Sequence, residues 1–255
     1  MKPFVFTHKI RTFETDSRGL LTSSSLLNIL QYGAGKHADD LGWSVRSLHE
    51  SGKTWVLQRF YVEIEKLPSD DEAITLTTYP TGAERILAYR DYKVENEAGE
   101  LLVKATSSWV ILDLESRRVV AVPDNVKDIS ESFGPKITSL PASRITPFDP
   151  QNEPDENITH EFRVRRHDLD LNRHVNNVRY MEWAIESVPE AVFETKRLST
   201  LDIVFKAECF YGDTVMSVSR PLPVSSQDGA RTGYEHLLYR KSDQKPVCLV
   251  HSAWK

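Results

Sequence analysis

Side chains of the kinds found in catalytic sites crowd the segment from His167 to Glu186. Asp170, Asn172 and His174 follow one another at alternate positions, in the pattern D-x-N-x-H. If the chain is extended there, Asp170 and Asn172 point to one side. A single Asp or Asn before a helix usually only caps it, but three functional side chains at this spacing favour a chemical role.

The residues after this motif predict an amphipathic helix that begins near Arg173, because apolar residues then recur at nearly helical spacing. The first N–H groups of a helix lack partners within it and carry partial positive charge. We therefore expect the backbone N–H groups of Val175 and Asn176 to bind an oxyanion. Such donors serve reactions in which an oxygen atom becomes negatively charged.

The composition is that of an ordinary globular chain. It has 255 residues, of which 40% are hydrophobic and 27% are charged, enough for one large domain or two of ordinary size. The net charge of -5 argues against nucleic acid as the main partner, because phosphate binding needs a broadly basic surface. No apolar run approaches the roughly 18 residues that cross a bilayer, so no membrane span is expected.

The first residues have neither signal-peptide nor transit-peptide character. We therefore expect a cytoplasmic protein, or a mature form that has lost its targeting segment. Cys209 and Cys248 have no metal-type spacing and no partners for a disulfide framework, which suits a reducing compartment. We expect no cofactor and no metal site.

An internal repeat relates the two halves of the chain. The segment that begins at Thr7 can be laid over the segment that begins at Thr159 without a gap, at a shift of 152 residues. Both copies predict a strand, a turn and a helix. At this shift the places of Asp170, Asn172 and His174 are taken in the first copy by Arg18, Leu20 and Thr22. Only the second copy is then equipped for chemistry.

Each half predicts one lead-in strand, one helix and about four antiparallel strands. In the first half, a helix at about 22–41 precedes β-rich segments at 54–64, 73–79, 85–95 and 101–112. In the second half, the β-rich segments are 196–206, 214–219, 234–240 and 247–254, and the SSW sequence at 107–109 is echoed by SAW at 252–254. A sheet must cover the apolar face of each helix, so we expect an α+β fold.

The proline-rich stretch between the halves predicts a linker with little regular structure. We place an N-terminal repeat at residues 1–122, the linker at 123–157 and a C-terminal repeat at 158–255. Apolar residues within the linker favour a segment that is partly docked over a disordered spacer.

A helix wrapped by an antiparallel sheet, twice in one chain, resembles the double (tandem) hot-dog architecture. The motif DLNRHVNNVRY at Asp170–Tyr180, with Glu208 and Cys209 further on, is similar to the acyl-acyl-carrier-protein (acyl-ACP) thioesterases of plant plastids and bacteria. The blocks from Thr54 to Pro68 and from Ala105 to Asp124 are similar to that family's first half. The resemblance covers nearly the whole chain.

This resemblance implies a hydrolase of fatty acid biosynthesis, which cleaves the thioester of fatty acyl-ACP and releases free fatty acid. It implies that the catalytic residues are Asp170, Asn172, His174 and Glu208, and that Glu208 and His174 activate a water. It also implies that the second repeat is catalytic while the first encloses the acyl chain. A competing mechanism uses Cys209 as the nucleophile, although a cysteine in a strand is more often an inert apolar residue.

The partner implied by the resemblance is an acidic acyl carrier protein with a phosphopantetheine-linked fatty acyl chain. Arginines near the motif are candidates for binding it, namely Arg163, Arg165, Arg166, Arg173 and Arg179. Alternation along a strand would place Arg163 and Arg165 on one face. Whether two chains form a homodimer stays open. The alternative functions are an acyl-coenzyme-A thioesterase, a fatty-acyl binding module without catalysis, and a hydratase or dehydratase.

Overall fold

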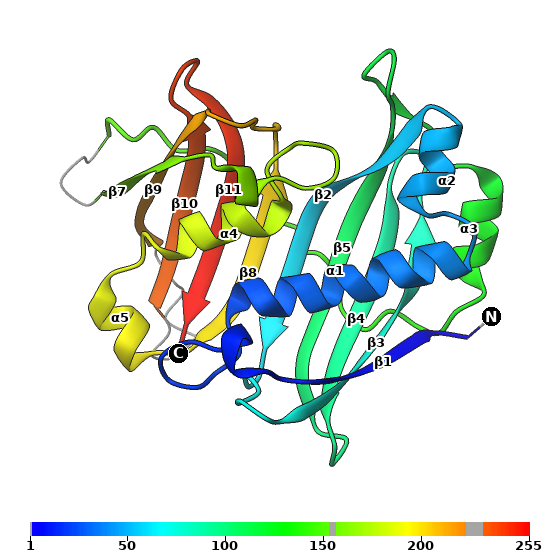
Figure 1. Cartoon of the computed structure of the whole chain (residues 1–255), viewed down its shortest axis with the longest axis horizontal. Coiled ribbons are helices and arrows are strands. Elements are labelled where there is room, and N and C mark those ends of the chain that lie inside the picture. The colour runs from blue at the N-terminus through cyan, green and yellow to red at the C-terminus, as the bar shows by residue number, and fades with distance from the viewer. Residues whose placement is uncertain (1, 153–156, 223–231) are drawn as a thin grey trace. The chain divides into compact units, whose positions relative to one another are not determined.

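The computed structural model describes residues 2–152, 157–222 and 232–255 (Figure 1). Its contacts divide the chain into two units, Met1–Leu140 and Pro141–Lys255. Each unit is an antiparallel sheet with one main helix packed against it. The expected α+β fold is therefore confirmed.

The N-terminal unit is built on a sheet with the strand order β1-β3-β4-β5-β2. Strands β3, β4 and β5 form the expected meander, but β2 pairs with β5 rather than with β3, the next strand in the sequence. The short strand β6 adds to β5. The strands span Phe4–Lys9 (β1), Lys53–Ile64 (β2), Ala73–Ala83 (β3), Ala88–Asn96 (β4), Leu101–Asp113 (β5) and Val119–Val120 (β6).

Helix α1 (Ser23–Asp40) packs against β1 and β3 of this sheet. Thr22 caps its N-terminus, because the Thr22 hydroxyl accepts a hydrogen bond from the N–H of Ser25 at 3.1 Å. Gly33 lies on the buried face, where a Cβ would come within 2.5 Å of Cδ2 of Leu76. The close approach of helix and strand thus favours glycine here, although glycine lowers helix propensity.

The C-terminal unit repeats the plan with the strand order β8-β11-β10-β9-β7. Its strands span Ile158–Arg163 (β7), Leu198–Phe205 (β8), Thr214–Leu222 (β9), Thr232–Arg240 (β10) and Lys245–Trp254 (β11). The echoed Ser-x-Trp motifs also make the same contact in both units. The indole N–H donates to the serine hydroxyl two residues earlier, at 2.8 Å for Trp109 and 3.0 Å for Trp254.

Helix α4 (Asn177–Ile185) packs against β9, β10 and β11. It has 9 residues where α1 has 18. Just beyond its end, the hydroxyl of Ser187 donates to Ser217 on β9 at 3.1 Å. These two buried serines are equivalent to Gly33 and Leu76, so a polar contact replaces an apolar one between helix and sheet. Ser187 follows Gly33 at a shift of 154 residues, and the same shift relates Phe6, which pairs with Leu76, to His160, which pairs with Ser217.

A second buried polar cluster lies in the sheet of the C-terminal unit. The ring of His236 on β10 is hydrogen-bonded to Ser219 on β9 through Nδ1 and to Ser252 on β11 through Nε2. All three residues are buried. Because each buried polar atom has a partner, the cluster links three strands without the cost of an unsatisfied group.

Matching hydrogen bonds fix the register of the repeat at a shift of 154 residues, so the shift of 152 is wrong. After the first lead-in strand the N–H of Leu20 binds the carboxylate of Asp16 at 3.2 Å, and after the second the N–H of His174 binds that of Asp170 at 3.2 Å. The next N–H in each copy also has an equivalent acceptor, with Leu21 donating to Pro68 at 2.8 Å and Val175 donating to Cys209 at 2.9 Å. The Thr-His pairs used to align the sequences are not equivalent.

Part of the segment expected to be an irregular linker is a helix. Helix α3 (Asp124–Glu131) packs against β3. Downstream, the hydroxyl of Tyr79 donates to the carbonyl of Pro135 at 2.8 Å, and the carboxylate of Asp91 accepts from the N–H of Ile137 at 2.7 Å. These contacts hold this part of the segment against the N-terminal unit.

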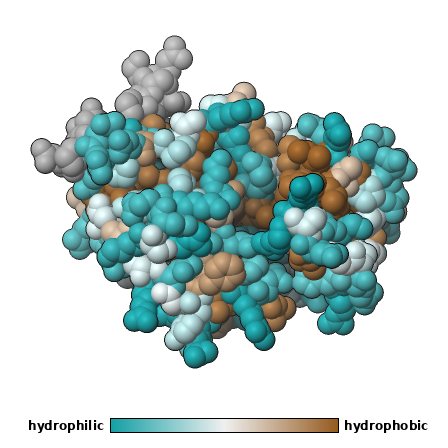
Figure 2. Space-filling model, turned by 90° about the horizontal axis from the view of Figure 1, so that it is seen from above, coloured by the Kyte–Doolittle hydropathy of each residue, from teal (hydrophilic) through white to brown (hydrophobic). Residues whose placement is uncertain are grey.

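Two short helices, α2 (Val45–Glu50) and α5 (Glu190–Thr195), complete the α-helices of the described ranges, and 3-10 turns lie at Thr12–Glu14 and Arg166–Asp168. None of the helices in the described ranges is both long enough and apolar enough to cross a membrane. The surface seen in Figure 2 is largely hydrophilic, with hydrophobic residues gathered in separate patches.

Candidate active site

The turn before α4 is held closed by the carboxylate of Asp170. It accepts hydrogen bonds from the backbone N–H groups of Asn172 at 2.8 Å and His174 at 3.2 Å. The N–H of Asp170 donates to the carbonyl of His174 at 2.8 Å, and Arg173 between them has a left-handed backbone with a φ of 64°. The motif is therefore a tight turn, and not the extended lead-in that the sequence predicted.

His174 and Glu208 lie side by side, 34 positions apart in the sequence. The distance from Nδ1 of His174 to Oε1 of Glu208 is 3.3 Å, and the two side chains are 25% and 33% exposed. Phe210 lies edge-on to the imidazole, with 5.1 Å between ring centroids and an interplanar angle of 89°. Water can reach this pair, while the packed aromatic ring restricts the position of the imidazole.

The loop that carries Glu208 follows β8 and is tied to its surroundings through the backbone. The carbonyl of Glu208 accepts a hydrogen bond from Nη1 of Arg240 at 3.2 Å. The N–H of Cys209 donates to the hydroxyl of Tyr180 on α4 at 3.0 Å. No spacing in the sequence links Arg240 or Phe210 to the motif, so these supports could not be predicted.

The two backbone N–H groups predicted to hold an oxyanion are already used. The N–H of Val175 donates to the carbonyl of Cys209 at 2.9 Å, and that of Asn176 donates to the carbonyl of Asp168 at 2.8 Å. The prediction is wrong because α4 begins only at Asn177. Both N–H groups therefore belong to the turn, where backbone carbonyls already accept their hydrogen bonds.

Two other donors near the turn have no hydrogen-bond partner among the described residues. One is the side-chain amide of Asn172, which is exposed. The other is the N–H of Asn177, the first residue of α4. The side chain of Asn176 is used as the helix cap, since it accepts from the N–H of Val178 at 3.1 Å.

Cys209 is a poor candidate for a nucleophile. Its side chain is fully buried, and burial raises the pKa of its thiol to about 11. A thiol with that pKa is almost entirely protonated at neutral pH, and the thiolate is the reactive form. Burial likewise raises the pKa of Cys248.

The N-terminal unit contains the same turn, closed by the same kind of residue. The carboxylate of Asp16 accepts from the N–H groups of Arg18 at 2.8 Å and Leu20 at 3.2 Å. The aspartate is therefore common to both copies, and the interpretation that the first copy lacks all three polar residues is wrong. An aspartate at this place is needed to build the turn whether or not a reactive group follows.

Among the described residues, the positions of His174 and Glu208 hold no such pair in the N-terminal unit. That unit has a different His–Glu contact, His8 with Glu14 at 2.9 Å, whose side chains are only 11% and 14% exposed. Leu20 is equivalent to His174, because each donates its backbone N–H to the aspartate of its turn. Leu67 is equivalent to Glu208, because each directly precedes the residue whose carbonyl accepts the next N–H of the turn, Pro68 or Cys209. Leu67 is buried. The difference between the copies is therefore concentrated in the imidazole, the second carboxylate and Asn172.

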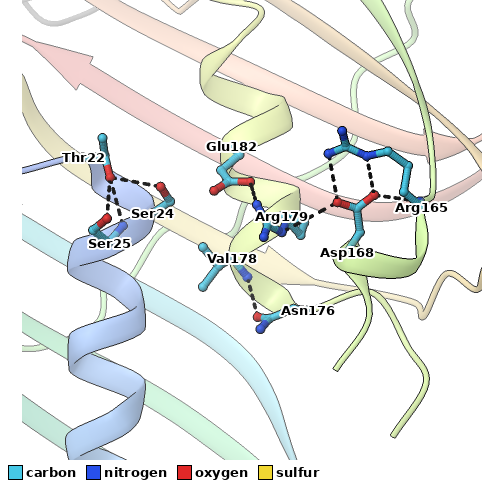
Figure 3. A network of polar contacts seen from close by, with 9 residues as sticks. All are labelled: Thr22, Ser24, Ser25, Arg165, Asp168, Asn176, Val178, Arg179 and Glu182. Carbon is cyan, nitrogen blue, oxygen red and sulfur yellow. Dashed lines mark hydrogen bonds and ion pairs between the residues drawn. The ribbon is translucent and has the colours of Figure 1, made fainter. Parts of the chain in front are cut away.

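Two of the five candidate arginines for carrier binding are committed to ion pairs. Figure 3 shows the buried carboxylate of Asp168 between Arg165, with Nη2 at 3.2 Å, and Arg179, with Nε at 3.8 Å. Nη1 of Arg179 also contacts Glu182 at 2.6 Å. These cations are partly neutralised within the unit.

The other three arginines, Arg163, Arg166 and Arg173, are exposed. Strand β7 ends at Arg163, and Arg165 lies just before the 3-10 turn Arg166–Asp168. The prediction that Arg163 and Arg165 share one face of a strand is therefore wrong. Within the described residues, no three His, Cys, Asp or Glu side chains are grouped so that they could hold a metal ion.

The fold and the site together define a class, a tandem hot-dog protein whose second unit brings His174 and Glu208 together within reach of water. The family model of the acyl-ACP thioesterase N-terminal domain matches residues 2–130, and that of the C-terminal domain matches residues 151–255. The chain belongs to the acyl-ACP thioesterase family.

Individual relatives agree with this membership. The chloroplastic oleoyl-acyl carrier protein thioesterase of Coriandrum sativum is 31% identical over 227 residues, which are 83% of this chain and 61% of that protein, so the chain spans less than two thirds of its length. Among solved structures, a putative oleoyl thioesterase from Lactobacillus plantarum is 26% identical, with a TM-score of 0.86 over 99% of this chain and 96% of that one. An acyl-ACP thioesterase from Bacteroides thetaiotaomicron is 25% identical, with a TM-score of 0.83 over 98% and 97%.

Proposed function

We propose that this protein hydrolyses the thioester of fatty acyl-ACP and releases the free fatty acid. The observation that carries the proposal is the 3.3 Å contact between His174 and Glu208, at positions that Leu20 and Leu67 occupy in the N-terminal unit. Family membership supplies the substrate class.

Glu208, with the help of His174, is the proposed general base. A water that contacts the pair gives up a proton to it as the oxygen attacks the thioester carbonyl carbon. The carbon–sulfur bond of the tetrahedral intermediate then breaks, and the departing thiolate takes the proton back from the pair. A positioned base of this kind contributes roughly a hundredfold to ten-thousandfold.

The oxyanion of the intermediate needs donors that no other group uses. The amide of Asn172 and the N–H of Asn177 fit this need better than the two bonded N–H groups of the turn. Asp170 contributes by fixing the backbone from which Asn172 and His174 project.

The acyl chain is proposed to be enclosed by the N-terminal unit. In this unit the helix and the sheet approach closely through an apolar contact between Gly33 and Leu76. At the equivalent place the C-terminal unit has the hydrogen-bonded pair Ser187 and Ser217. An apolar surface suits a hydrocarbon chain better than a buried polar pair does, because burial of the chain against apolar surface is favourable.

The test is thiol release from acyl-ACP and from acyl-coenzyme A that carry the same acyl chain, over a series of chain lengths. We expect a higher kcat/KM for acyl-ACP. Faster cleavage of acyl-coenzyme A would favour a coenzyme-A thioesterase with the same chemistry. The absence of release from every thioester would contradict the proposal and favour a binding module.

A further inference from the structure

Large hydrophobic side chains are exposed in the C-terminal unit at only one place among the described residues. Leu171 is 103% exposed, Tyr211 is 55% exposed and Phe210 is 46% exposed. Leu171 lies between Asp170 and Asn172 in the turn, and the two aromatic residues lie in the loop after Glu208. Exposed apolar side chains gathered around a reactive pair are typical of a surface that another molecule covers.

Two cations accompany these apolar side chains. The guanidinium carbon of Arg166 lies 4.6 Å from the ring centroid of Tyr211. Arg173 is exposed and keeps a left-handed backbone that glycine adopts more easily, with a φ of 64°. A side chain at such a position costs about 1 kcal/mol, so its presence favours a role for the guanidinium. We call Arg166, Leu171, Arg173 and Tyr211 the loop patch.

The matching loops of the N-terminal unit provide an internal comparison. With the shift of 154 residues in the turn, and the equivalence of Cys209 with Pro68 in the second loop, the loop patch corresponds to Thr12, Ser17, Gly19 and Asp70. The glycine has the same left-handed backbone as Arg173, with a φ of 70°. The fold therefore does not require the apolar and basic side chains, and they occur where the reactive pair occurs.

We propose that the loop patch is the docking surface for the acidic carrier protein that presents the thioester, an inference that rests on the proposed function. The whole chain has a net charge of -5 and so repels an acidic partner at long range. Arg166, which lies over Tyr211, and Arg173, in the turn that carries His174, orient that partner, and the exposed Leu171 and Tyr211 supply the apolar contact. Arg165 and Arg179 contribute less, because Asp168 and Glu182 already pair with them.

The test replaces patch residues with those of the N-terminal unit, which the same turn tolerates. Two double variants are compared with the wild type, Leu171→Ser with Tyr211→Asp, and Arg166→Thr with Arg173→Gly. Each is assayed with acyl-ACP and with the same acyl group on pantetheine, which has no carrier protein. The matched control is Phe13→Ser, which removes an exposed aromatic residue from the N-terminal unit.

We expect KM for acyl-ACP to rise about tenfold in each double variant, as for loss of an interface contact, while kcat/KM for acyl-pantetheine stays within about twofold. The Phe13→Ser variant should match the wild type with both substrates. Equal KM values for acyl-ACP, or a parallel loss with acyl-pantetheine, would overturn the docking surface.

A binding titration with the unacylated holo carrier protein separates this inference from the proposed function. We expect the Kd to rise about tenfold in both double variants. An unchanged Kd would overturn the docking surface even if the wild type hydrolyses thioesters. A wild type that binds the carrier through the patch but cleaves no thioester would contradict the proposed function alone.

Discussion

Asp170 and Glu208 are both carboxylates of one site, but their contacts give them different roles. Asp170 uses its oxygen to hold two backbone N–H groups, and Asp16 does the same in a unit without a reactive pair. Glu208 faces the imidazole of His174, and its equivalent in the other unit is Leu67. At the residue scale, Asp170 is therefore a positioning residue and Glu208 is the proposed base.

The paired variants Asp170→Ala and Asp16→Ala test this distinction. Each loses hydrogen bonds to a charged group, so we expect each to lower the free energy of unfolding by about 1–3 kcal/mol. Only Asp170→Ala should also lower kcat, because only that turn carries His174. Urea unfolding and thiol release measure the two effects. A loss of kcat as large in Asp16→Ala would contradict the assignment.

Cys209→Ala should retain activity within about threefold of the wild type, because the buried thiol is protonated and water attacks directly. The measurement is kcat for thiol release, together with mass spectrometry of the enzyme quenched during turnover. Loss of most activity in this variant, or an acyl group trapped on Cys209 in the wild type, would support the covalent mechanism instead.

At the scale of elements, the turn and the helix after it form one construction used twice. In both units an aspartate closes the turn and a polar side chain caps the helix. Between them, the N–H of Leu21 or Val175 donates to a carbonyl in the loop after the unit's second strand. The hydrogen bonds are conserved between copies while the side chains differ. Alignment by residue identity therefore predicted a shift of 152 residues, and the matching hydrogen bonds show that the shift is 154.

The buried His236 should make the stability of the C-terminal unit depend on pH. Burial, with a smaller contribution from the nearby His251, lowers the pKa of its ring to about 3. The unfolded chain has the ordinary value near 6.5, so between these values it binds a proton that the folded ring does not. The free energy of unfolding should thus fall as the pH drops below 6.5 and be unaffected by this ring above it.

Urea unfolding at pH 7 and pH 5 measures the effect. The ring alone should account for about 2 kcal/mol between these two pH values. The control is the His236→Gln variant. Its free energy of unfolding should be lower at both pH values, but the difference between its values at pH 7 and pH 5 should be smaller than in the wild type by about that amount. The same change in both proteins would contradict a neutral buried His236.

At the scale of the whole molecule, the sequence predicted the duplicated α+β plan and most strands, because alternating and helical periodicities are strong in both halves. It did not predict α3, because a proline-rich stretch hides an 8-residue helix. That His174 and Glu208 act together was predicted only from the resemblance to a family. Their contact depends on the loop after β8 returning to the turn, and no spacing in the chain encodes that return.

The division of labour between the two copies is tested most directly by kcat for acyl-ACP at saturating substrate in Glu208→Gln and in Leu67→Ala, the equivalent position of the other unit. Loss of a general base predicts that Glu208→Gln lowers kcat by about a hundredfold or more with little change in unfolding temperature. Leu67→Ala empties a buried site, so it should lower the unfolding temperature and leave kcat within about threefold. Full activity in Glu208→Gln, or an equal loss of kcat in both variants, would contradict a reaction centred on His174 and Glu208.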